Sequence, residues 1–163
     1  MRCFLSFLFL LLWVPVPAQD IVRVSDARNV VNLAFDAEYI EDSACQLSIQ
    51  QIMQPENSLP WQRLGKYAAN FGITSSAFWL KTKLQNTSGA PLLVRLNLHA
   101  LNDVMLYETK DGRIVNEYRS GDRVPFEKRV IRSTDFLFPL AVPQDSSTTV
   151  YLRVRHNRGT EFT

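Results

Sequence analysis

Aromatic, cationic and amide side chains recur at alternate positions along several stretches of the sequence. They are Trp79, Lys81, Arg95, Asn97, His99, Tyr107, Tyr151, Arg153 and Arg155. An aromatic ring offers a flat apolar face to a sugar, and arginine, asparagine and histidine donate hydrogen bonds to hydroxyl or carboxylate oxygens. The sequence therefore predicts that some of these residues line a groove for a carbohydrate-like ligand, and the guanidinium groups would favour an acidic saccharide.

The same residues also fit the ordinary solvated face of a β-sheet, on which arginine and tyrosine lie over their strand neighbours. The sequence does not show which strands share a sheet, so it leaves both interpretations open. The groove interpretation predicts that replacing Trp79 and Arg95 by alanine weakens glycan binding, whereas the solvated-face interpretation predicts no change.

No pattern typical of a reaction centre or of a metal site accompanies these residues. The two histidines, His99 and His156, have no metal-site spacing. Asp103 follows Asn102 and offers a single carboxylate, which suits a turn better than acid–base catalysis. Ser75 and Ser76 lack the Gly-x-Ser-x-Gly frame of a nucleophile. We therefore expect no catalysis, no metal and no cofactor.

From Phe78 onward the sequence alternates between apolar and polar residues, as half-buried strands do. The expected strands are Phe78–Leu84, Pro91–His99, Val104–Glu108, Arg113–Tyr118, Phe136–Leu140 (ended by Pro139) and Thr149–His156. Asp111-Gly112 is a strong hairpin-turn signal, and Asn86–Pro91 is dense in turn-forming residues. Apolar positions expected to face inward include Leu80, Leu84, Leu92, Val94, Leu96, Val104, Leu106, Val150, Leu152 and Val154. The pattern predicts an all-β protein, an antiparallel β-sandwich.

The residues before Phe78 give a less regular pattern. Val30–Leu33 and Phe35–Ile40 could be strands, whereas Leu47–Gln54 suits a short helix and a strand equally well. Pro55 and Pro60 bracket a loop.

The first residues resemble an export signal. Arg2 precedes an apolar run from Phe4 to Val14, and Pro15 and Pro17 end it. The small residues Val16 and Ala18 predict cleavage before Gln19, so residues 1–18 are expected to be a signal peptide. The alternative is an uncleaved membrane anchor, although the run is shorter than the roughly 20 residues that span a bilayer.

Composition and net charge limit the kinds of molecule that the protein is expected to bind. The formal net charge of the 163 residues is +2, with scattered cations, which argues against nucleic-acid binding. Of the two cysteines, Cys3 lies in the predicted signal peptide. Cys45 then has no intramolecular partner, so the fold must depend on core burial.

Five stretches in order resemble a known family: NFGITSSAFWLK, LNDVMLYETKDGR, SGDRVPF, FLFPL and TVYLRVR. AEYIEDSACQLSIQQI is similar to the start of the same domain. Together they resemble the type-two extracellular domain of bacterial seven-transmembrane receptors with diverse intracellular signalling modules. The resemblance covers about Val30 to Thr163.

This resemblance implies a jelly-roll β-sandwich similar to carbohydrate-binding modules, on the periplasmic side of the inner membrane. Such a domain precedes seven membrane helices and an output domain such as a histidine kinase or a diguanylate cyclase. We expect residues 19–163 to be this sensor domain, truncated at its last strand and connected to the membrane only through missing downstream helices. A missing strand would expose a sheet edge, which predicts poor solubility or a homodimer. The alternative function is a protein-interaction module without a small ligand.

Overall fold

The computed structural model describes residues 20–156 apart from 27, 29, 73 and 98–100. Strands dominate this part of the chain, so the expected all-β class with antiparallel sheets is confirmed. The elements are β1 (Ile21–Val24), β2 (Glu38–Asp42), α1 (Ile49–Met53), β3 (Gln62–Arg63), β4 (Ala77–Asn86), β5 (Leu92–Leu96), β6 (Asp103–Lys110), β7 (Arg113–Ser120), the 3₁₀ turn η1 (Phe126–Lys128), β8 (Phe136–Leu140) and β9 (Ser146–Arg155).

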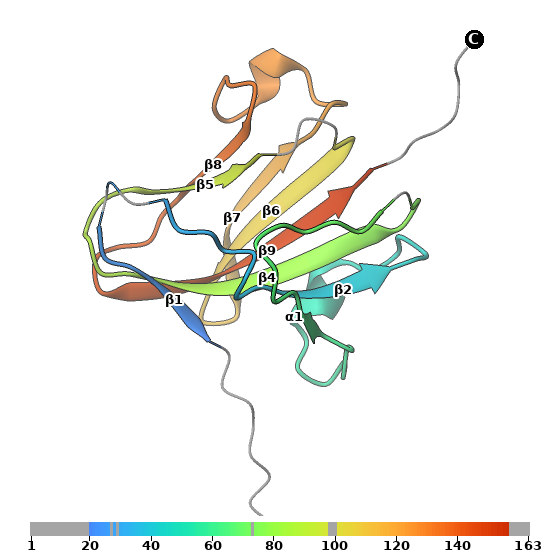
Figure 1. Ribbon diagram of the computed structural model, residues 1–163, viewed down its shortest axis with the longest axis horizontal. Helices are drawn as coiled ribbons and strands as arrows, with labels where there is room; N and C mark the ends of the chain where they lie inside the picture. The colour runs from blue at the N-terminus through green and yellow to red at the C-terminus, as the bar shows by residue number, and fades with distance from the viewer. Residues whose placement is uncertain (1–19, 27, 29, 73, 98–100, 157–163) are drawn as a thin grey trace, which may run out of the picture.

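The strands form a large and a small sheet (Figure 1). The large sheet has seven strands in the order β3-β2-β4-β9-β6-β7, with β1 added beside β4, and the small sheet contains β5 and β8. Among the described residues only the pairing of β1 with β4 is parallel. The jelly-roll connectivity implied by the resemblance stays a prediction.

Strand β4 is the centre of the large sheet. It pairs with β9 along its whole length, from Ala77 opposite Arg155 to Asn86 opposite Ser146. Two shorter strands share its other edge, since β2 pairs with residues 77–81 and β1 with residues 83–86. The central strand therefore has a partner on both sides at nearly every residue.

The main core lies between the two sheets. It contains Val94, Phe136, Phe138 and Leu140 of the small sheet and Val22, Phe78, Leu84, Val104, Leu106, Val150 and Val154 of the large one. The positions that sequence alternation assigned to the inward face of β4, β6 and β9 lie in this core or against it, which confirms that part of the prediction.

The opposite face of the large sheet is covered by α1. The Ser48 hydroxyl accepts a hydrogen bond from the Gln51 backbone N–H (3.3 Å), and the Gln51 side chain accepts one from the Ser48 N–H (2.9 Å). This reciprocal capping box satisfies backbone donors at the helix start. Ile49 and Ile52, one turn apart, are buried against the sheet. Of the two structures that suited Leu47–Gln54, the helix is the one that forms.

The N-terminal part departs from the prediction. Val30–Leu33 is not a strand, and β2 begins at Glu38 rather than at Phe35. A turn intervenes, because Asn32 Oδ1 accepts a hydrogen bond from the Ala34 N–H (2.9 Å) and the Ala37 N–H bonds the Ala34 carbonyl (3.3 Å). Strands β1 and β3 were not predicted, since runs of four and two residues are too short for a periodic pattern.

Pro139 does not end the fifth predicted strand, and that expectation is wrong. β8 continues through Pro139, opposite Leu93, to Leu140. Proline lacks the N–H that a ladder uses, but it is tolerated on edge strands. Among the described residues β8 has a strand partner on one side only, so the proline nitrogen can face the open side.

The expected hairpin turn at Asp111-Gly112 is present between β6 and β7. Both residues have positive φ, 49° and 71°, which is the backbone of a type I′ turn. The predicted signal peptide and the end of the chain lie outside the described residues. No helix within the described ranges is both long enough and apolar enough to cross a bilayer.

Gly121 joins two of the stretches that carry the family resemblance. Its φ is +115°, and a Cβ at this position would lie 2.5 Å from the backbone carbonyl oxygen of Asn102. Beside it, the Asp122 N–H donates to the Leu101 carbonyl (2.8 Å). The close approach of these two backbones therefore requires glycine.

Replacing Gly121 by alanine should lower the free energy of unfolding by about 3 kcal/mol, because the new methyl group meets backbone that cannot rotate away. Gly112→Ala is the matched control: its φ is also positive, yet nothing lies within 4 Å of the added Cβ, so about 1 kcal/mol is expected. Urea unfolding followed by circular dichroism gives both values. Equal losses for the two variants would contradict the assignment.

Candidate functional site

The face of the large sheet that carries α1 gathers most of the residues predicted to bind a ligand. Strand register places Trp79 opposite Arg153, and Arg153 opposite Met105. In the next row Lys81 lies opposite Tyr151, and Tyr151 opposite Tyr107. Arg155 falls on the same face at the end of β9, opposite Ala77. The structure therefore brings six of the nine side chains together on one face, a grouping that depends on the strand register and that alternation within single strands did not predict.

The remaining three lie elsewhere. Arg95 is on β5 of the small sheet, where its Nε lies 2.9 Å from the Asp135 carboxylate, and Asn97 is exposed just after that strand. His99 lies outside the described residues. Arg95 and Asn97 therefore do not share a surface with Trp79, and whether either binds a ligand stays a prediction.

Trp79 is not an exposed platform. Only 1% of its surface is accessible, because α1 and the loop after it cover the ring. Its ring stacks with that of Tyr107 at a centroid distance of 6.0 Å. The indole N–H is buried and has no hydrogen-bond partner within the described part of the chain. In this conformation Trp79 supports the site from beneath rather than touching a ligand from solvent.

The cations on this face are held in ion pairs and over aromatic rings. Lys81 Nζ lies 2.9 Å from Glu38 Oε2 and 4.2 Å from the centroid of the Trp61 ring. Arg153 Nη1 lies 3.1 Å from Asp103 Oδ2, and its guanidinium is 6.0 Å from the Trp79 ring. Such contacts fix the direction of both long side chains. A ligand that takes these cations must compete with carboxylates already in place.

Burial changes the acid–base behaviour of two tyrosines on this face. Loss of solvent raises the pKa of Tyr107, and the negative charge of Glu117 raises it further. Loss of solvent likewise raises the pKa of Tyr151, with Glu38 as the second cause. Both hydroxyls therefore stay protonated and neutral at physiological pH, and they can donate as well as accept hydrogen bonds.

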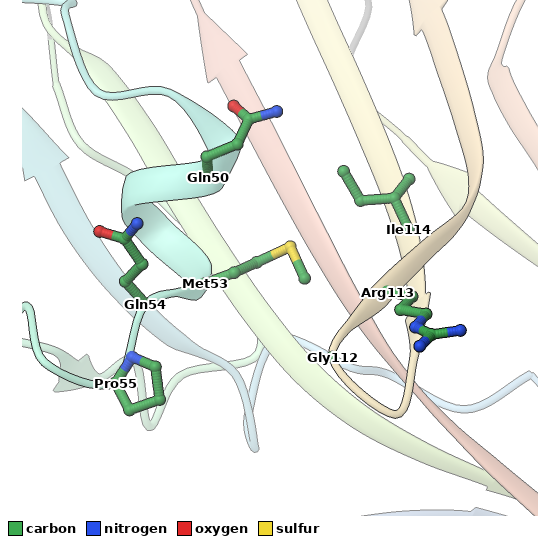
Figure 2. Close-up of a pocket in the computed structure, with 7 residues that line it drawn as sticks. All are labelled: Gln50, Met53, Gln54, Pro55, Gly112, Arg113 and Ile114. Carbon is green, nitrogen blue, oxygen red and sulfur yellow. The ribbon is translucent and has the colours of Figure 1, made fainter.

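A hollow of about 460 Å³ opens at the edge of this face (Figure 2). It lies between α1 with the residues after it and the β6–β7 hairpin. Its lining is Gln50, Met53, Gln54, Pro55, Gly112, Arg113 and Ile114. Figure 2 shows Met53 extending from the helix toward β7 and Ile114 projecting from β7 toward the helix. Met53 also packs against the cluster that contains Trp79 and Tyr107, so the hollow adjoins the predicted face.

The chemistry of this lining is mixed. Met53, Pro55 and Ile114 supply apolar surface, whereas the amides of Gln50 and Gln54 can both donate and accept hydrogen bonds. Sequence analysis did not predict the hollow, because strands β3 to β6 lie between its two sides in the sequence. The one local signal was the Asp111-Gly112 turn, which marks where the hairpin must end.

Sequence analysis also missed Glu108, a carboxylate buried near the edge of the main core. Only 1% of this residue is exposed. Its Oε2 accepts hydrogen bonds from Asn116 Nδ2 (2.7 Å) and from the Ala141 backbone N–H (3.0 Å). These bonds connect β6 to β7 and to the chain leaving β8, so Glu108 ties the two sheets together. A second hollow of about 70 Å³ lies beside it.

No cluster of three or more histidine, cysteine or acidic residues suited to a metal ion occurs within the described ranges. A family model described as 7TMR-DISM extracellular 2 matches residues 35–163 of the chain. The chain belongs to this family. The resemblance stated from the five stretches is thereby confirmed. No curated protein matches the sequence.

Membership makes this chain an extracellular domain of 7TMR-DISM receptors, and hence a sensor input domain rather than a catalytic one. The match contains β2 to β9, α1 and every residue that lines the hollow of Figure 2. Of the strands in the described part of the chain, β1 alone lies before it. The candidate site of this 7TMR-DISM extracellular 2 domain is therefore part of the family's domain and not an appendage to it.

The raised tyrosine pKa values predict a loss of stability in alkali. Below the ordinary tyrosine pKa of 10.0 both folded and unfolded chains hold the phenolic protons. Above it the unfolded chain loses them first, so the free energy of unfolding should fall as pH rises from 10 toward the folded-state values. Tyr107→Phe/Tyr151→Phe should make this fall shallower. Urea unfolding at pH 8 to 11 measures the slope, and an unchanged slope would contradict the assignment.

Proposed function

We propose that this 7TMR-DISM extracellular 2 domain is the periplasmic input module of a bacterial membrane receptor and binds a carbohydrate-like ligand between α1 and the β6–β7 hairpin. The observation that supports this site is the hollow of about 460 Å³ on the α1 side of the large sheet. Ligand sites of small molecules usually have volumes of roughly 300–1,000 Å³ and combine apolar walls with a few polar groups. This hollow has both.

The lining suits a sugar better than a wholly apolar ligand. A pyranose presents C–H groups on one face and hydroxyl groups at its rim, so Met53 and Ile114 would contact the ring and the glutamine amides its hydroxyls. Arg113 also lines the hollow, and its guanidinium would add a charge-assisted hydrogen bond to an acidic sugar if it turned toward the ligand. An acidic saccharide is therefore the preferred ligand within this proposal.

In this proposal the ligand does not contact Trp79, Tyr107 or Tyr151, which support the hollow from the sheet beneath it. Lys81 and Arg153 lie on the same face of the sheet. Met53 connects the hollow to the cluster around Trp79. A ligand that displaces Met53 would therefore disturb packing on the sheet itself, and through β9 that change could reach the end of the domain. An output domain such as a histidine kinase or a diguanylate cyclase would read the change across the membrane.

The other candidate is a protein-interaction module without a small ligand. The observation that favours it is a set of exposed apolar side chains away from the hollow, among them Leu93, Phe126 and Val130, which are 51%, 45% and 47% exposed. Solvent-exposed apolar residues of this kind occur at protein contacts when they form a continuous patch.

Binding of neutral and uronic-acid oligosaccharides to the purified chain, first on a glycan array and then by calorimetry, tests the proposal. Gln50→Ala/Gln54→Ala should weaken binding of the best saccharide roughly tenfold to a hundredfold, because two hydrogen bonds of about 1 kcal/mol each are lost. Gln144→Ala, an exposed glutamine that does not line the hollow, should leave affinity unchanged. Binding should also change the fluorescence of Trp79, with Trp79→Phe as its control. An array with no bound saccharide would favour the interaction module.

A further inference from the structure

Strand β7 is the long open edge of the large sheet. Within the described residues its strand partner is β6 on one side, and no strand pairs with the other side. The opposite edge of this sheet is β3, which has two residues. An eight-residue edge strand presents unpaired N–H and C=O groups that can accept another strand.

Only part of this edge is regular. The ladder of β6 and β7 shifts register between Glu108 and Thr109, which leaves Val115 as an extra residue. Beyond that bulge, residues 116–120 pair without interruption with residues 104–108. A bulge bends its strand and disrupts the ladder. Ser120, at the end of this run, is only 4% exposed, so the surface suited to strand addition is Asn116–Arg119.

A second copy of the chain can add to this edge only in a few registers. In an antiparallel ladder the opposed residues are either both hydrogen-bonded or both not. Neighbouring residues of one strand alternate in this respect, so a residue cannot oppose the next residue of an identical strand. A two-fold axis between two copies must therefore pass where one residue faces the same residue of the second copy. If that residue is Tyr118, residues 117–119 of the two copies pair, and each Glu117 faces Arg119 of the second copy. If it is Glu117 or Arg119, like charges oppose each other.

The two charged side chains are available for this contact. Both are exposed, and the Arg119 side chain is 68% accessible. Its nearest acidic neighbour is Asp103, at 3.7 Å, which already pairs more closely with Arg153. We propose that two copies of this domain associate through β7 in the register centred on Tyr118, held by backbone hydrogen bonds and two symmetric Glu117–Arg119 pairs. This association does not depend on a ligand in the hollow.

Charge reversal tests the register. Glu117→Arg should raise the dimer dissociation constant roughly tenfold in sedimentation equilibrium, because each reversal replaces two attractive pairs by two repulsive ones. Arg119→Glu should do the same. The double variant Glu117→Arg/Arg119→Glu should return to within about threefold of the parent, since the pairs are restored in the opposite sense. Glu127→Arg, on the exposed turn η1, is the control and should change nothing.

Cross-linking gives a readout that does not rely on affinity. In a Cys45→Ser background, chains with Glu117→Cys mixed with chains with Arg119→Cys should form a disulfide between different chains, because opposed Cβ atoms lie about 5 Å apart. Glu117→Cys alone should cross-link far less, since the two copies of residue 117 would be roughly 8 Å apart. A chain that remains monomeric at all concentrations would overturn the proposal. A dimer unaffected by the reversals and cross-linked equally by all cysteine pairs would also overturn it.

Discussion

The long pairing of β4 with β9 is the constraint on which both faces of the large sheet depend. Ten consecutive residue pairs fix the register from Ala77 to Asn86. Because side chains alternate along a strand, a slip of one residue would move Trp79 into the main core and Phe78 under α1. The apolar residues of β4 belong to two different cores, so no neighbouring register satisfies both.

Asn86 shows how this pairing is ended. Its buried side chain donates to the carbonyls of Ala90 (2.9 Å) and Val142 (2.8 Å), and its Oδ1 accepts from the N–H groups of Ser88 (3.1 Å) and Gly89 (3.2 Å). One amide thus closes the turn after β4 and fastens it to the chain before β9. A buried amide stabilises a fold when all its hydrogen-bonding groups are satisfied, as here.

Local sequence patterns predicted the structural features that depend on a single strand or turn. The strands from β4 onward, their inward faces and the Asp111-Gly112 turn all follow from alternation and turn chemistry. β1 is too short to show a period, and α1 could be told from a strand only by its burial against the sheet. The burial of Trp79 was missed for the same reason, since alternation shows that its ring leaves the main core but not that a helix covers it. The hollow joins Gln50–Pro55 to Gly112–Ile114, a contact that no local pattern encodes.

The central strand β4 pairs with two strands near the start of the domain and with one strand at its end. β1 and β2 precede β4, whereas β9 is the last strand described. A chain that crosses a membrane from its N-terminus therefore delivers β4 long before the strand that completes it. Sheets closed by distant segments form slowly, and the apolar residues of β4 remain uncovered until then. For a chain that is exported before it folds, this topology implies that β4 must be protected from aggregation until β9 follows it.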